Sequence, residues 1–142
     1  MRFRNVVLVF VAALALASLG NPGTLQAQAF PLKVTVPFDF YFANERFPAG
    51  VYIVERMRAT DVLRVSDENG HAAIALTNAA YTPPRDLGRS QIVFNRYGDT
   101  YFMSEVRWQE YPTGRALPAG SAEVEIAKTI TKQRVIAVIA NR

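Results

Sequence analysis

Hydrophobic and polar residues alternate along much of this chain, and a period of two is typical of β-strands with one buried face. The alternation is longest over residues 33–42, where the apolar side chains share one face, so we expect a single long strand there. Pro37 falls on the opposite face and cannot donate to a neighbouring strand, which predicts a sheet edge or a bend. Shorter runs predict strands at residues 51–57, 62–66 and 71–77, the last two joined by a polar turn that ends in Asn-Gly.

Residues 91–106 carry the clearest structural signal of the chain. Two runs rich in β-branched and aromatic residues flank Gly98 and Asp99. This pattern predicts a β-hairpin, because glycine readily adopts the positive φ that a tight turn needs. Neither face of the hairpin is purely polar, so we expect both faces to be partly covered. With Gly98 and Asp99 as the turn, the expected cross-strand pairs are Arg96–Tyr101, Phe94–Met103 and Ile92–Glu105.

The C-terminal part of the chain departs from the alternating pattern of the strands. Acidic residues followed by lysines suit the dipole of a helix, which predicts one short helix at about residues 122–132, with Ser121 as a possible cap. The apolar, β-branched run at residues 134–140 predicts a closing strand, with continuation of the helix as the alternative. Segments rich in proline, glycine and polar residues predict loops at residues 43–50, 78–90 and 109–120.

The expected fold is all-β, a small antiparallel β-barrel or sandwich of about seven strands with one short C-terminal helix. No internal repeat, low-complexity segment or linker divides the strands, which predicts one domain. Because the chain has no cysteine, the hydrophobic core alone must hold this fold.

The N-terminus has the features of a signal peptide. Two arginines precede an apolar run at residues 6–17, and an Ala-x-Ala cleavage pattern ends at Ala29. The alternative is a membrane anchor, but this run falls well short of the ~20 apolar residues that span a bilayer. We therefore expect residues 1–29 to be a signal peptide cleaved after Ala29, and residues 30–142 to form a single β-rich domain without a membrane span. The expected location is periplasmic or secreted.

Composition narrows the possible chemistry. Without cysteine the chain has neither a thiol nucleophile nor a thiolate metal ligand, and its single histidine, His71, excludes a multi-histidine metal site within one chain. We expect neither a metal nor another cofactor. The net charge is +4, and loss of the two N-terminal arginines leaves 14 basic and 12 acidic residues. Because no Lys/Arg cluster stands out, we expect no nucleic-acid partner.

Two sets of residues invite a catalytic interpretation. Ser66, Asp67 and His71 lie around one turn, but no nucleophile-elbow motif accompanies them, so an exposed turn histidine is the favoured interpretation. Asp39 and Glu105 could form a glycosidase-like carboxylate pair, which needs a separation of roughly 5–10 Å and one raised pKa. Single acids on strand faces are the favoured alternative, and we assign no catalytic residue.

A polar cluster on the hairpin is the candidate ligand-binding site. Its members are Asn95, Arg96, Tyr101, Glu105 and Arg107. Such side chains could line a cleft that recognises a polar ligand. The structural alternative is that Arg96 and Glu105 satisfy each other, or that Arg96 stacks on a neighbouring tyrosine. Exposed aromatic residues could also stack on a glycan, although most of them could equally belong to the core.

Three stretches of the chain resemble a group of small, exported, uncharacterised bacterial proteins. They are residues 36–40 with 47–52, residues 93–99 with 101–106, and residues 117–118 together with the helix that follows. The resemblance spans most of the mature chain. It implies export and a single small domain, and it brings no activity or site residues.

The leading functional hypothesis is a non-enzymatic exported protein of the cell envelope with a binding or structural role. Its partner would be a small molecule, a glycan or another envelope protein. The first alternative is an envelope hydrolase acting on a glycan or peptide through Asp39 and Glu105. The second is a homo-oligomer that assembles through strand edges, with residues 34–42 as the candidate edge.

Overall fold

The computed structural model describes residues 31–57, 60–83, 88–109 and 111–139. The predicted signal peptide and its cleavage site after Ala29 lie outside these residues. Within the described part of the chain, β-strands dominate and a single short helix is present, as expected for an all-β fold.

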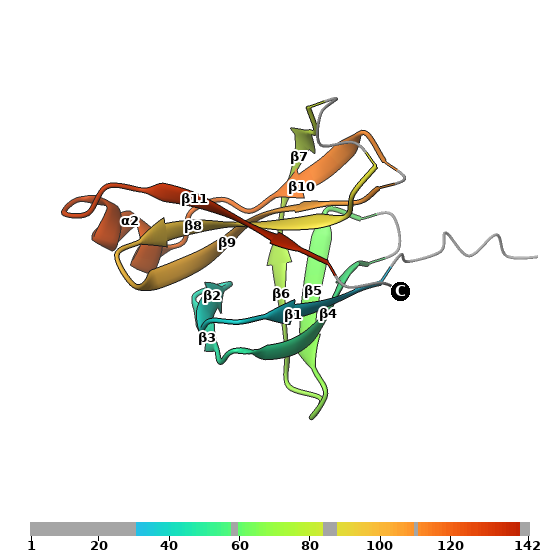
Figure 1. Cartoon of the computed structure of the whole chain (residues 1–142), viewed down its shortest axis with the longest axis horizontal. Helices are drawn as coiled ribbons and strands as arrows, with labels where there is room; N and C mark the ends of the chain where they lie inside the picture. Colours follow the sequence, from blue (N-terminus) through green and yellow to red (C-terminus); the bar gives the residue numbers. More distant parts are fainter. Residues whose placement is uncertain (1–30, 58–59, 84–87, 110, 140–142) are drawn as a thin grey trace, which may run out of the picture.

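The strands form two sheets, which cross one another in Figure 1. The first sheet is antiparallel throughout and has the order β1-β4-β5-β6. Its strands are β1 (Leu32–Val36), β4 (Gly50–Arg56), β5 (Val62–Asp67) and β6 (Ala72–Leu76). Among the described strands nothing pairs with the outer edges of β1 and β6, so the architecture is sandwich-like and not a closed barrel.

The second sheet has the order β11-β8-β9-β10-β7, and a small hairpin of β2 and β3 joins it beside β9. Its strands are β2 (Phe40–Phe42), β3 (Glu45–Phe47), β7 (Asn78–Tyr81), β8 (Gln91–Tyr97), β9 (Thr100–Arg107), β10 (Thr113–Ala116) and β11 (Gln133–Val138). The helix α2 (Ser121–Ala127) lies at the end of this sheet that carries the β8–β9 turn (Figure 1).

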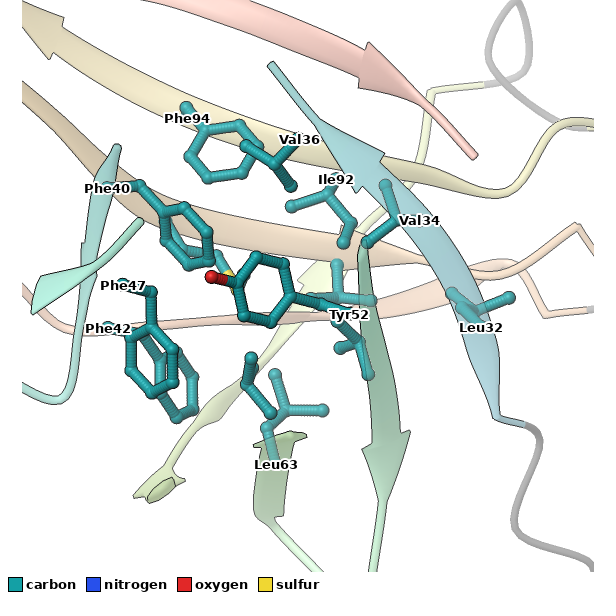
Figure 2. Close-up of a cluster of buried hydrophobic side chains, with 14 of the residues drawn as sticks. Leu32, Val34, Val36, Phe40, Phe42, Phe47, Tyr52, Leu63, Ile92 and Phe94 are labelled. Atoms are coloured by element: carbon teal, nitrogen blue, oxygen red, sulfur yellow. The ribbon is translucent and has the colours of Figure 1, made fainter. Parts of the chain in front are cut away.

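One hydrophobic core fills the space between the inner faces of the two sheets. Figure 2 shows the ring of Tyr52, from the first sheet, beside that of Phe40, with Phe94 above both in this view. The ring centroids of Phe40 and Tyr52 lie 5.1 Å apart, and those of Phe40 and Phe94 lie 5.4 Å apart. Both contacts are edge-to-face, the geometry that aromatic quadrupoles favour. The alternation predicted for residues 33–42 is confirmed at its ends, because Val34 and Phe42 are both buried.

The predicted long strand is nevertheless two strands in different sheets. The chain bends at Pro37, as its position suggested, so that β1 lies in the first sheet and β2 in the second. Asp39 holds the bend, because it accepts hydrogen bonds from the backbone N–H of Ala49 at 2.8 Å and from Arg46 at 2.6 Å. These two donors stabilise the ionised carboxylate and lower the pKa of Asp39.

All three predicted loops contain a short strand that the sequence pattern did not predict. Together with the division of residues 33–42 into β1 and β2, they bring the described residues to eleven strands where about seven were expected. Residues 43–50 include β3, residues 78–90 include β7, and residues 109–120 include β10. In β10 the glycine at position 114 is required by packing, because a Cβ there would lie 2.6 Å from the carbonyl oxygen of Val106.

The central hairpin turns at Gly98, whose φ is +61°, and its pairs Arg96–Tyr101 and Phe94–Met103 are confirmed. The predicted pair Ile92–Glu105 is wrong. A β-bulge shifts the register beyond Phe94, so that Val106 lies opposite Ile92 and Glu105 lies opposite Val93. The bulge brings Val106 into the core.

The C-terminal elements follow the expected order with different boundaries. The helix ends at Ala127 and is shorter than predicted. Ser121 is its first residue and not its cap, since Gly120 occupies the N-cap position without a side-chain hydrogen bond. The segment that follows is the strand β11, antiparallel to β8, and not a continuation of the helix.

Candidate functional site

The five candidate residues on the hairpin belong to three separate groups. The first is Arg96 with Tyr101. The Nε of Arg96 donates to the carbonyl oxygen of Gly98 at 2.6 Å, and its guanidinium lies 5.5 Å from the centroid of the Tyr101 ring. Stacking of Arg96 on a tyrosine is therefore confirmed, whereas the suggested pairing of Arg96 with Glu105 is wrong.

Glu105 and Arg107 form the second group. The Nη2 of Arg107 donates to Glu105 at 2.7 Å, and Arg134 of β11 donates to the other oxygen of Glu105 at 2.7 Å. The Arg107 side chain is buried, and Glu105 is thus enclosed between two guanidinium groups. This arrangement ties β9 to β11 and supports a structural role for both residues.

Asn95 belongs to a third group, which the sequence pattern did not predict. Its Nδ2 donates to the Oε1 of Glu123 at 2.8 Å, and the hydroxyl of Tyr97 donates to the same oxygen at 3.1 Å. Glu123 is on α2 and is only 5% exposed. A carboxyl group that loses its hydration in this way needs partners, and the hairpin supplies two.

A cavity of about 240 Å³ lies beside Glu123, in the seam between the two sheets. It is bounded by β2 and its turn, the end of β6, β9 and the segment that leads into α2. Its lining residues are Tyr41, Phe42, Ala43, Asn44, Ala75, Leu76, Phe102, Met103, Leu117, Pro118, Ala119, Gly120 and Glu123. Most of these are apolar, and Glu123 is the charged residue among them.

The hydrogen bonds from Asn95 and Tyr97 both go to Oε1 of the Glu123 carboxyl group. Within the described ranges no donor reaches its Oε2. The rim of the cavity is fixed nearby, because the Asn44 side chain packs so closely on Gly120 that a Cβ at position 120 would overlap it. Asn44 itself lies in the β2–β3 turn with a φ of +62°. The cavity thus combines mostly apolar lining residues with one acidic residue, Glu123.

Tyr97 should make folding sensitive to alkaline pH. Burial, then the nearby charge of Glu123, then the hydrogen bond to Glu123 raise the pKa of Tyr97 above 10.0. From about pH 10 the unfolded chain therefore releases a proton that the folded chain keeps, and stability falls as pH rises. We expect the free energy of unfolding to fall less steeply above about pH 10 in Tyr97→Phe than in the wild type.

Urea unfolding at a series of pH values measures this difference. Tyr52→Phe is a useful comparison, because burial raises the pKa of Tyr52 as well, but at a site with no contact to Glu123. If the free energy of unfolding fell equally steeply with pH in Tyr97→Phe and in the wild type, a raised pKa of Tyr97 in the folded protein would be contradicted.

The two catalytic interpretations find no geometric support. The Nε2 of His71 lies 2.5 Å from Glu45, and its ring packs on Phe47, while Ser66 is buried in β5. His71 is exposed at a turn, as predicted. Asp39 pairs with Arg46, whereas Glu105 pairs with Arg107 and Arg134. The described residues also contain no group of three or more acidic or histidine side chains that could hold a metal ion.

Comparisons with protein-family models, curated proteins and solved structures found no match. In the described ranges no helix has the length and apolar character needed to cross a membrane.

Proposed function

We propose that this protein is exported to the cell envelope and acts there as a non-enzymatic binding protein, with the cavity beside Glu123 as its binding site. The observation that carries the proposal is the largely buried Glu123 side chain, which lines a cavity whose other lining residues are mostly apolar. Its Oε1 is held by Asn95 and Tyr97, while its Oε2 has no donor among the described residues.

The cavity favours a ligand with a donor or cationic end and a short apolar body. A protonated amine or guanidinium would satisfy Glu123, and a hydrogen bond to a charged group is among the stronger ones in proteins. Leu117 and Met103 would contact the apolar part. At about 240 Å³ the cavity is below the ~300 Å³ at which typical small-molecule pockets begin, so it suits a ligand fragment or a single side chain.

Export is tested directly by the mature N-terminus. The full chain, expressed in a bacterial host and recovered from the envelope fraction, should begin at Phe30. Replacing the small residues of the cleavage pattern at Ala27 and Ala29 with bulky ones should block processing, because signal cleavage needs small residues there. A processed protein found only in the cytoplasm, or an unprocessed chain in every fraction, would contradict export.

Binding is tested with n-butylammonium, which joins a cation to a short apolar chain. We expect it to shift the NMR resonances of residues that line the cavity, including Leu117 and Met103. The isosteric variant Glu123→Gln should weaken this binding at least about tenfold, since it removes the charge that pairs with the ammonium group.

Glu125→Gln is the matched control, because Glu125 lies on the same helix but is exposed and pairs with Lys128. The neutral analogue 1-butanol tests whether the cation is needed. Shifts of equal size for Glu123→Gln and the wild type, or no shifts at the cavity, would contradict the proposed site.

A further inference from the structure

The strand β6 is the last strand of the first sheet and lies beside the cavity, and no other strand of the described chain pairs with its outer edge. The backbone N–H of Thr77 donates to Asp61 at 2.7 Å, and the N–H of Asp67 donates to the carbonyl of His71 at 2.9 Å. Because antiparallel hydrogen bonds join alternate residue pairs, odd-numbered residues of this strand bond to β5. The backbone N–H and C=O groups of Ala72, Ile74 and Leu76 therefore point outward, away from β5.

The side chains along this edge are unusual for an exposed strand. Ile74 is 60% exposed and Leu76 is 73% exposed. Edge strands usually carry charge, proline or a bulge that discourages pairing with another chain. The edge of β6 shows none of these features over Ala72–Leu76. By contrast, β1 at the other end of the sheet exposes Lys33 and Thr35 and buries its apolar residues.

The same edge adjoins the cavity. Ala75 and Leu76 line it, and Ala73 and Ala75 face the core side of the sheet. A strand added beside β6 would direct alternate side chains to that same side, because side chains alternate between the two faces of a sheet. One such side chain would enter the cavity, where Glu123 supplies the complementary charge. The intervening side chains would lie beside Ile74 and Leu76.

We infer that the ligand is an extended polypeptide segment that adds as a strand to the edge of β6 and places a lysine or arginine side chain in the cavity against Glu123. This inference rests on the proposed function, since it uses the same cavity. The backbone of β6 would supply hydrogen bonds that do not depend on sequence, as in other cases of strand addition. Glu123 would select the basic residue, and apolar residues next to it in the segment would cover Ile74 and Leu76.

The probe is a blocked peptide of about six residues, the length of a typical strand, with alternating valine and threonine and a lysine placed at each position in turn. We expect one or two lysine positions to bind measurably better than the others by calorimetry. For the best peptide, Glu123→Gln should weaken binding at least about tenfold, and Glu125→Gln should leave it unchanged.

Ile74→Pro tests the strand addition itself. Its N–H points outward, so proline removes a donor from the free edge without breaking a hydrogen bond to β5, a position at which strands tolerate proline. We expect Ile74→Pro to weaken peptide binding at least about tenfold, and Ile74→Val to have little effect. Methylation of the peptide nitrogens that face β6 should have the same consequence as Ile74→Pro. Unfolding curves confirm that each variant is folded.

The outcomes separate the two proposals. Loss of binding in Glu123→Gln but not in Ile74→Pro or with the methylated peptide would overturn strand addition and leave the cavity as a cation site. Binding of n-butylammonium without binding of any peptide would overturn it in the same way. Light scattering that showed a dimer of the wild type, dissociated by Ile74→Pro, would assign the β6 edge to a second copy of this chain and also overturn the inference.

Discussion

Phe40→Ala is expected to lower the free energy of unfolding by about 3–5 kcal/mol, a large part of the 5–15 kcal/mol typical of a whole domain. Phe40 is fully buried. Its ring stacks on Phe47 of β3 with centroids 5.5 Å apart, and it meets Tyr52 of β4 and Phe94 of β8 edge-on. Truncation would therefore remove contacts to both sheets at once and leave a cavity between them.

Urea unfolding monitored by circular dichroism measures this loss. Phe40→Leu keeps most of the buried volume and should cost less, so it remains measurable if Phe40→Ala does not fold. Ile74→Ala is the control, because Ile74 is also a large apolar side chain in a strand but is mostly exposed, and such substitutions usually stay within about 0.5 kcal/mol. A cost for Phe40→Ala as small as that of Ile74→Ala would contradict the role of Phe40 in joining the two sheets.

Which face of the chain is buried could be predicted from residues 33–42, but not which sheet each half joins. The alternation continues through the bend at Pro37, since Phe38 also packs toward the core, against Phe94 and Tyr101. A period of two defines the buried side of a strand, and it is insensitive to a change of sheet that keeps the same residues inside. The bend itself is fixed by Asp39 and its donor Ala49, ten residues away along the chain.

The register of the hairpin could also be predicted only in part. Gly98 fixed the pairs nearest the turn, and these were predicted correctly. The bulge beyond Phe94 depends on local packing, with Ser104 donating to the carbonyl oxygen of Val93 at 3.1 Å. The bulge adds one residue to β9, and this moves the pairing of every later residue of β9 by one position. Glu105 therefore lies opposite Val93 and not opposite Ile92 as predicted.

The cavity could not be predicted from the sequence pattern, because its charged residue, Glu123, lies on α2 and not on the β8–β9 hairpin. Asn95 was a predicted candidate residue, but its partner Glu123 is 28 positions later on a helix of seven residues. One signal was available: a glutamate in the first turn of a short helix that has to pack on a sheet. That signal predicts a helix start as readily as a buried contact, so only the tertiary structure separates the two.

The second large effect is expected at Arg115, which joins the two sheets by hydrogen bonds where Phe40 joins them by packing. Arg115 lies in β10 and is almost fully buried. Its Nη2 donates to the carbonyl oxygen of Thr77 at 2.8 Å and to Asp61 at 2.7 Å, and its Nε donates to the hydroxyl of Thr77 at 2.9 Å. Thr77 lies between β6 and β7, where the chain passes from the first sheet to the second.

Arg115→Met keeps an unbranched apolar stem but removes the Nε and Nη2 groups that donate the three hydrogen bonds. The carbonyl group of Thr77 would then be buried without this partner, while Asp61 is exposed enough to recover water. We expect a loss of about 2–4 kcal/mol in the free energy of unfolding, since breaking a buried charged contact costs far more than losing one at the surface.

Arg64→Met is the matched control for Arg115→Met. Arg64 pairs with Glu55 at 2.8 Å, a distance close to that between Arg115 and Asp61, but its side chain is 41% exposed. Such pairs contribute about 0–1 kcal/mol and weaken in salt. Both variants break an arginine–carboxylate pair by the same substitution, but Arg115 is buried and also donates to Thr77. If they cost the same, or if salt reduced both effects equally, the crossover at Thr77 would not depend on the buried guanidinium, and packing alone would hold the two sheets together.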